Sequence, residues 1–223
     1  MTSVLKKFIQ YNNEEEQEET ELWMLPYSTL MLTLVILFIM FYAFSLSESV
    51  EYETALSDLA ETNPNDPRVT QMKQEIALAQ NVRDFIKKNN LADKIQLVIT
   101  PLSIKIKMES FALFDSGSAE VKKDILFFLE HLNGQLKPMS NRVIAEGHTD
   151  NVPIHNQKFD SNWELSSARA FSVIYFLLNN GISPERLIAH GFGEFRPAYT
   201  NDTETDRAKN RRIEITVVRG ANE

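Results

Sequence analysis

The chain has 223 residues, enough for one membrane-spanning segment and one domain of ordinary size. Its 31 acidic residues outnumber its 23 basic ones, giving a net charge of −8, and this balance argues against a nucleic-acid partner, which usually meets a basic surface. The absence of cysteine excludes disulfide bonds and thiol chemistry.

An acidic tail and a long apolar run come first. Residues 1–21 are polar and lack hydrophobic periodicity, so we expect a disordered tail. Residues 22–47 carry no charge, and as a helix they would extend about 39 Å, more than the roughly 30 Å of a bilayer's hydrocarbon core. The acidic flank and the length favour a retained transmembrane helix over a cleaved signal peptide. Lys6 and Lys7 precede the run, and no Lys or Arg occurs from residue 48 to residue 67, which places the N-terminus in the cytoplasm.

A linker region, residues 48–70, follows the apolar run. Val50, Leu56 and Leu59 form a thin apolar stripe among acidic residues and predict a short, weakly amphipathic helix. Two interpretations stay open: a passive, solvated stalk, or a segment that packs on a partner or on the membrane surface. The sequence TNPNDP at 62–67 breaks the pattern and indicates a linker.

The remaining residues, 71–223, have the pattern of one globular domain. Alternating apolar residues predict strands at 95–99, 104–108, 142–147, 186–193 and 212–218. Helical spacing predicts helices at 72–86, 125–136, 161–181 and 203–210. Strands that alternate with helices favour an α/β domain with one sheet.

The helix predicted at 161–181 has clear ends. Ser161 and Glu164 match a capping box, and Gly181 is a typical residue just after a helix. The residues that we place on one face of this helix are Leu165, Ala168, Ser172 and Tyr175.

Three polar clusters in the second half are candidates for a binding site. In EGHTDNVP, His148, Thr149 and Asp150 lie where a strand becomes a loop. In SNWELSSARA, Arg169 lies about two turns into a helix, and DRAKNRRIEI places Arg212 at the start of the last strand.

His148 raises the question of a metal or a catalytic centre. No second histidine stands at metal-binding spacing, no cysteine is present and no serine elbow occurs. The other histidines are His131, His155 and His190, and they are scattered. We therefore expect no metal site and no enzymatic activity.

The three clusters, in this order, resemble the OmpA-like peptidoglycan-binding domain over residues 95–218. The longer stretch EGHTDNVPIHNQKFDSNWELSSARAFSV and the front of the apolar run, WMLPYSTLMLTL, resemble MotB-type flagellar stator subunits. The resemblance implies one N-terminal transmembrane helix and a periplasmic domain with a mixed sheet and helices. It also implies a bacterial inner-membrane protein, a homodimer inside a ring of a MotA-like polytopic protein, and a role for residues near 48–61 as a plug against ion leak. No cofactor is implied beyond a coupling ion, H⁺ or Na⁺.

The resemblance also implies where peptidoglycan binds. A stem residue such as diaminopimelate carries an ammonium and carboxylates, and arginine can hold a carboxylate with two parallel hydrogen bonds. Asp150 and Arg169 match the family's ligand-binding positions, although such a pair standing alone is more often structural. Thr149, Asn162 and Arg212 fall near the same groove, and for Arg211 and Arg212 a solvated start of the last strand is an equal alternative.

One position departs from the family. MotB-type stators carry an aspartate in the membrane helix that binds the coupling ion, and alignment on PYSTLM puts Thr29 there. Tyr27, Thr29 and Thr33 are the candidates for the ion path, and a hydrogen bond from Thr29 to its own helix is the structural alternative. The aspartate was replaced, naturally or by engineering, or the chain anchors without conducting, or the alignment is out of register.

Three functions follow from these observations. The first is a stator subunit of an ion-driven flagellar motor, anchored to peptidoglycan. The second is a membrane-tethered peptidoglycan anchor that does not conduct ions. The third is a stator-like subunit of a different ion-driven machine.

Overall fold

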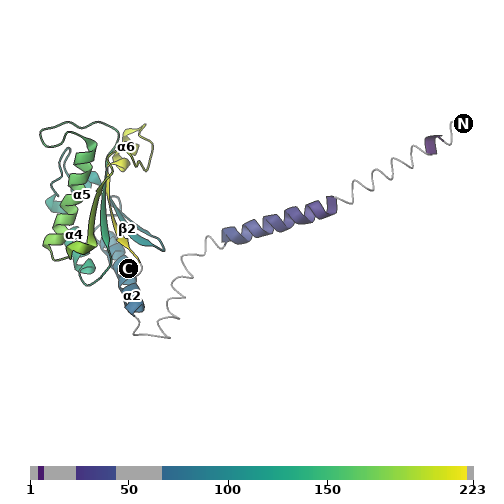
Figure 1. Ribbon diagram of the computed structural model, residues 1–223, viewed down its shortest axis with the longest axis horizontal. Helices are drawn as coiled ribbons and strands as arrows, with labels where there is room; N and C mark the ends of the chain where they lie inside the picture. Colours follow the sequence, from purple (N-terminus) through teal and green to yellow (C-terminus); the bar gives the residue numbers. More distant parts are fainter. Residues whose placement is uncertain (1–4, 8–23, 44–66, 220–223) are drawn as a thin grey trace. The chain divides into compact units, whose positions relative to one another are not determined.

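The computed structural model describes residues 5–7, 24–43 and 67–219, which belong to two units divided between Thr62 and Asn63 (Figure 1). In the first unit a helix runs from Met24 to Ala43, with a mean hydropathy of 2.1, and it is long and apolar enough to cross a membrane. Residues 5–7, within the tail expected to be disordered, are helical. The predicted helix that contains Val50, Leu56 and Leu59 lies outside the described residues.

Hydroxyl groups near the front of the apolar helix bond to their own backbone. Ser28, Thr29 and Thr33 each donate a hydrogen bond to the carbonyl oxygen three residues earlier, at 2.8–2.9 Å. This is the contact given above as the structural alternative for Thr29.

The second unit is built on a five-stranded sheet in the order β1-β2-β5-β3-β4. Strands β1 (Ile95–Ile99) and β2 (Ser103–Glu109) form an antiparallel hairpin. Strand β5 (Arg212–Val218) is antiparallel to both β2 and β3 (Val143–His148), while β4 (Leu187–Gly191) pairs with β3 in parallel. The predicted α/β class with one mixed sheet is confirmed, and each predicted strand is present to within a few residues.

Three long helices share an apolar core with one face of this sheet. They are α2 (Pro67–Lys88), α4 (Lys123–Leu136) and α5 (Asn162–Asn179), and Figure 1 shows α4 and α5 beside the sheet. Helix α2 begins at Pro67, within the predicted linker, because proline suits the first turn of a helix. The short helices are α3 (Ser110–Leu113), η1 (Pro184–Arg186) and α6 (Glu204–Asn210).

The ends of α5 form largely as predicted. The Ser161 hydroxyl accepts a hydrogen bond from the Glu164 N–H, whereas the Glu164 carboxylate bonds the N–H of Asp160 and not that of Ser161. Gly181, with φ of +93°, follows the last turn. The face of Leu165, Ala168, Ser172 and Tyr175 lies at the edge of the core, because Leu165 is buried and Tyr175 is 57% exposed. The buried residues of this helix are Asn162, Leu165, Ser166, Arg169, Ala170, Val173, Ile174 and Leu177.

A buried polar contact joins α2 to the C-terminal end of β5. The Glu75 carboxylate is 3% exposed and accepts hydrogen bonds from Asn141 Nδ2 at 2.7 Å and Arg219 Nε at 3.0 Å. Asn141 Nδ2 also donates to the carbonyl oxygen of Val218 at 2.8 Å. The first helix of the unit is therefore fastened to its last strand by charged and polar groups.

Candidate functional site

A groove of about 520 Å³ lies next to the C-terminal end of β3. Its walls come from α3 and the turn after it, the loop after β3, one side of α5, and the two ends of α6. The lining residues are Ser110, Phe111, Phe114, Asp115, Ser116, Gly117, Thr149, Asp150, Val152, Pro153, Ile154, Leu165, Arg169, Glu204 and Arg211. The structure thus brings Thr149, Asp150 and Arg169 to one site, although their motifs are separate in the sequence.

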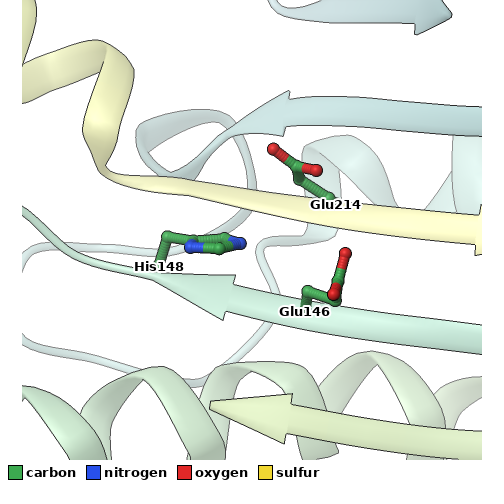
Figure 2. A group of neighbouring side chains, drawn as sticks. All are labelled: Glu146, His148 and Glu214. Atoms are coloured by element: carbon green, nitrogen blue, oxygen red, sulfur yellow. The ribbon is translucent and has the colours of Figure 1, made fainter. Parts of the chain in front are cut away.

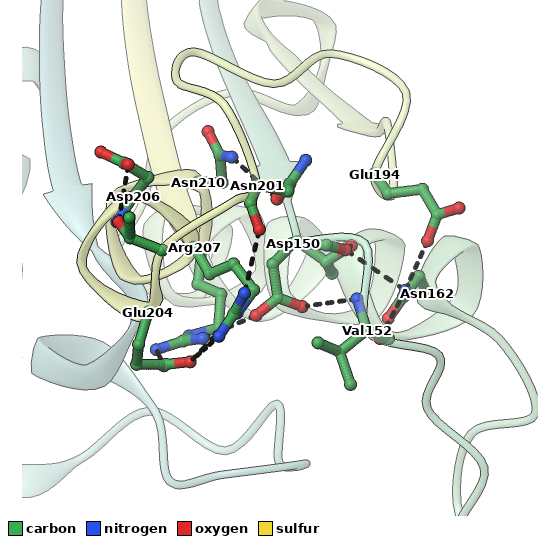
Figure 3. A network of polar contacts seen from close by, with 12 residues as sticks. Asp150, Val152, Asn162, Glu194, Asn201, Glu204, Asp206, Arg207 and Asn210 are labelled. Carbon is green, nitrogen blue, oxygen red and sulfur yellow. Dashed lines mark hydrogen bonds and ion pairs between the residues drawn. The ribbon is translucent and has the colours of Figure 1, made fainter.

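Asp150 supplies a buried carboxylate to the groove. Its side chain is 8% exposed, and its Oδ2 accepts a hydrogen bond of 2.6 Å from Arg211 Nη1. Its Oδ1 accepts the N–H of Val152 at 3.3 Å, as Figure 3 shows. These contacts fix the orientation of the carboxylate, and the long bond at Oδ1 leaves that oxygen with capacity for a further donor.

Arg169 supplies a buried cation. Its Nε donates to the carbonyl oxygen of Ser118 at 2.8 Å and its Nη2 to that of Asp115 at 3.3 Å, while the guanidinium lies 5.2 Å from the centre of the Phe114 ring. Within the described part of the chain, no carboxylate lies at ion-pair distance from it. Burial and the nearby Arg211 lower the pKa of Arg169 to about 10, so it remains charged at neutral pH. A buried cation with neutral acceptors only is suited to receive an anion from a ligand.

Arg211 connects the two sides of the groove. Besides Asp150, it binds Glu204 Oε1 through Nη2 at 2.8 Å, and Glu204 is also paired with Arg207. Burial lowers the pKa of Arg211, but the hydrogen bonds to Asp150 and Glu204 outweigh this effect and leave the pKa raised. Arg211 was not among the predicted binding residues, and no signal in the sequence distinguishes it from the adjacent Arg212.

Two further predicted site residues, Thr149 and Asn162, have different places at the groove. Thr149 lines the groove, and its N–H donates to the carbonyl oxygen of Gly193 at 2.9 Å. Asn162, at the start of α5, is not a lining residue: its Nδ2 donates to the carbonyl oxygen of Val152 at 3.0 Å and to Glu194 Oε2 at 2.9 Å (Figure 3). Asn162 therefore positions the loop that carries Asp150.

Arg212 differs from its prediction and does not line the groove. Its Nε donates to Glu214 Oε1 at 2.6 Å and its Nη1 to the carbonyl oxygen of Asn210 at 3.3 Å. Arg211 is the residue that ends α6 and Arg212 is the first residue of β5, so the two neighbouring side chains belong to different elements, and only that of Arg211 lines the groove. The proposed alternative, a solvated start of the strand, is also wrong, since Arg212 is 9% exposed.

The surroundings of His148 differ from what its spacing in the sequence suggests. It lies beside Glu146 and Glu214, and one potential ligand atom from each of the three residues lies within 4.8 Å of the others (Figure 2). Burial, and then Arg212, lowers the pKa of His148 to about 4. Burial raises the pKa of Glu214, but hydrogen bonds from Lys105 and Arg212 outweigh it and bring the pKa to about 2. No spacing motif finds such a cluster, because Glu214 reaches it from a different strand.

Comparisons with known proteins match both units of the chain. The model of the OmpA family matches residues 113–211, and the model described as membrane MotB of the proton-channel complex MotA/MotB matches residues 7–62. Motility protein B of Bacillus subtilis (strain 168) is 28% identical, and the match covers 94% of this chain and 95% of that protein. An uncharacterized protein of the same organism, YtxE, is 27% identical over 91% of this chain and 90% of its own length.

Solved structures extend these matches to the fold. The cell wall anchor of the T6SS from Pseudomonas aeruginosa is 31% identical with a TM-score of 0.57, covering 62% of this chain and 97% of that one. A MotB-like protein from Desulfovibrio vulgaris has a TM-score of 0.61 at 27% identity, covering 70% of this chain and all of that one. The periplasmic domain of Helicobacter pylori MotB has a TM-score of 0.53 at 26% identity, and the match covers 58% of this chain and 84% of that one. Since the apolar helix region, the C-terminal fold and the full length all match, the chain is a MotB-type protein with a C-terminal OmpA-like domain.

Proposed function

We propose that this protein is a subunit of a flagellar stator, anchored to peptidoglycan through the groove between Asp150 and Arg169. The observation that carries the proposal is the buried guanidinium of Arg169, which donates to two carbonyl oxygens and, within the described residues, has no carboxylate at ion-pair distance. A site of this kind gains a charge-assisted pair when a ligand brings its own carboxylate.

The ligand chemistry that fits is a peptidoglycan stem residue with both kinds of charge. Arg169 receives a carboxylate, and Asp150 receives an ammonium at its Oδ1, the oxygen that Arg211 leaves available. Thr149 and Val152 form the wall beside Asp150. Asn162 contributes indirectly, by holding the loop in place.

The proposed arrangement in the cell follows the family. The helix Met24–Ala43 crosses the inner membrane with the N-terminus in the cytoplasm, and the C-terminal unit lies in the periplasm. Two copies stand inside a ring of a MotA-like protein and form with it the path for H⁺ or Na⁺, in which Thr29 replaces the family's aspartate. Support comes from the matched family of the proton-channel complex MotA/MotB and from the full-length match to Motility protein B. The protein is a structural subunit of this complex and not an enzyme.

A second function, a peptidoglycan anchor without ion flow, is favoured by one observation. The helix Met24–Ala43 contains no ionisable carboxylate, and Thr29 donates its hydroxyl to the carbonyl oxygen of Pro26 at 2.9 Å. A threonine takes up no proton near neutral pH. An anchor in a machine other than the flagellum is a third reading, and the likeness to the T6SS cell wall anchor supports it.

Binding of the full chain, in detergent, to purified sacculi tests the groove. Arg169→Ala and Asp150→Asn are expected to leave the protein in the supernatant after centrifugation, because removing one side of a buried charge pair costs about 2–5 kcal/mol. Arg186→Ala is the matched control, since Arg186 also donates Nε and Nη2 to two carbonyl oxygens, those of Asn141 and Leu136, but lies outside the groove. If both groove variants pellet as the unmodified chain does, peptidoglycan binds elsewhere.

A further inference from the structure

Three potential metal ligands meet on the face of the sheet opposite the helices. Glu146 and His148 belong to β3 and Glu214 to β5, and Glu146 is directly paired with Glu214 in the strand register. Alternation along the strands sends all three side chains to the same side. Figure 2 shows them converging, with one ring nitrogen of His148 directed between the two carboxylates.

His148 is the unusual member of this cluster. It is 4% exposed, and neither ring nitrogen has a hydrogen-bond partner among the described residues. Its ring stacks on Phe192, with the ring centres 5.3 Å apart. A buried polar atom without a partner costs about 1–3 kcal/mol, so native proteins rarely leave two of them on one side chain unless a ligand uses them.

A cationic group already occupies the space between the carboxylates. Lys105 Nζ lies 2.7 Å from Glu214 Oε2 and 3.5 Å from Glu146 Oε2, and Arg212 Nε holds the other oxygen of Glu214 at 2.6 Å. The Lys105 side chain is 28% exposed, on a flexible stem that reaches solvent. Arg212 is buried and has backbone carbonyl partners as well. Of the two cations, Lys105 is therefore the one that can leave.

We propose that Glu146, His148 and Glu214 form a binding site for a divalent transition-metal ion, Zn²⁺, which enters in exchange for the ammonium of Lys105. One imidazole nitrogen and two carboxylate oxygens are a ligand set that Zn²⁺ accepts, whereas Ca²⁺ and Mg²⁺ prefer oxygen alone. Arg212 then orients Glu214 from outside the metal's coordination sphere. The ion fixes the end of β3, from which the loop with Thr149 and Asp150 begins, and the site does not depend on peptidoglycan.

The test is calorimetric titration of ZnCl₂ into the full chain in detergent, after removal of metal with a chelator. We expect one Zn²⁺ per chain, with affinity reduced at least about tenfold, or 1.4 kcal/mol, in Glu146→Gln and in His148→Gln. Lys105→Met removes the competing ammonium and should tighten binding by about tenfold, a gain that misfolding cannot produce. His155→Gln is the control, because His155 is exposed beside Asp160 and outside the cluster.

Different results test the site, the exchange with Lys105 and the choice of metal. Zn²⁺ located by anomalous scattering within about 2.0–2.2 Å of all three side chains supports the site. Equal Zn²⁺ affinity in the unmodified chain, Glu146→Gln and His148→Gln places the ion elsewhere and overturns it. Unchanged affinity in Lys105→Met overturns the exchange, and saturation by Mg²⁺ at the same concentration as Zn²⁺ overturns the choice of metal.

Discussion

Asp150 and Arg211, 61 residues apart in the sequence, meet in an ion pair of 2.6 Å at the wall of the groove. The Asp150 side chain is 8% exposed and that of Arg211 is 36% exposed, so the pair is only partly screened by water. Asp150 is thus held by one arginine and, in the proposed complex, shares its groove with a second arginine that is reserved for the ligand.

The contribution of the Asp150–Arg211 ion pair to stability should be measurable with a double-mutant cycle. Asp150→Asn and Arg211→Ala are expected to be non-additive in the free energy of unfolding by about 1 kcal/mol, as for a partly exposed ion pair. Urea denaturation of the two single variants and the double variant measures this. The same cycle between Asp150→Asn and Arg186→Ala should be additive, because Arg186 contacts carbonyl oxygens elsewhere. Additivity in both cycles would show that the ion pair contributes nothing.

Restoring the family's carboxylate should restore ion coupling. An aspartate costs about 2.5–3.5 kcal/mol at the centre of a membrane helix and is kept there only for function. We expect the unmodified chain to assemble with its partner but to give little or no torque, and Thr29→Asp to restore swimming in cells that lack the native subunit. Thr33→Asp, one turn further along the helix, carries the same charge and should not restore it. Full rotation with the unmodified chain would contradict the prediction.

The apolar stripe of residues 48–61 is expected to act as a plug against ion leak. Deletion of residues 50–60 in the Thr29→Asp background, with the partner co-expressed, should slow growth because ions then cross an unengaged stator. If the apolar side chains block the ion path, replacing Val50, Leu56 and Leu59 with serine should slow growth in the same way. Normal growth at matched expression would favour a passive stalk.

Acid should destabilise the C-terminal unit through His148. Its pKa is about 4 in the folded protein against 6.5 when unfolded, so the unfolded state binds more protons between these values and stability falls as pH drops. The expected loss between pH 7 and pH 5 is about 2 kcal/mol. Glu214, whose pKa falls from 4.5 to about 2, loses its contribution only below this window.

Urea denaturation at pH 7 and pH 5, with EDTA present, measures the difference. His148→Gln should remove most of the pH dependence, whereas His155→Gln should retain it, since His155 is exposed. Equal pH dependence in both variants would assign the effect to other groups.

Two glycines of the second unit should respond to alanine in opposite directions. A Cβ at Gly147, near the end of β3, would overlap the backbone of Ser166 in α5, with the carbonyl carbon 2.8 Å away. Gly134, inside α4, has open space around it. Thermal denaturation should show Gly147→Ala as strongly destabilising and Gly134→Ala as stabilising by about 0.5–1 kcal/mol. If Gly147→Ala left the stability unchanged, α5 would have to move easily away from the sheet.

The sequence was sufficient for the five strands and for four helices of the C-terminal unit, but not for the short helices α3 and η1. Strands were found because Ile104, Ile106 and Met108 alternate with lysines, a local pattern. Asp150 and Arg169 were selected through a family resemblance, not through periodicity. The choice between Arg211 and Arg212 depends on where α6 ends and β5 begins, which no local pattern gives.

Other features need contacts across the sheet. The buried face of α5 does not follow from the linear pattern, because exposed aromatic residues, such as Tyr175, look like core residues there. The His148 cluster depends on the register of β3 against β5, which pairs Glu146 with Glu214. No local signal contains that register.

The contact between Glu75 and Arg219 has a mechanical consequence. Tension along the chain from a membrane anchor would enter the C-terminal unit at Pro67, the first residue of α2. The ion pair between Glu75 and Arg219 transmits this force from α2 to the residue that follows β5. Strand β5 runs from there to Arg211 at the groove, between two antiparallel neighbours. Ladder hydrogen bonds lie across the strand, so a pull along β5 loads all of them at once instead of opening them one by one. The groove proposed to bind peptidoglycan and the point where tension enters the unit are thus joined by a strand loaded in shear.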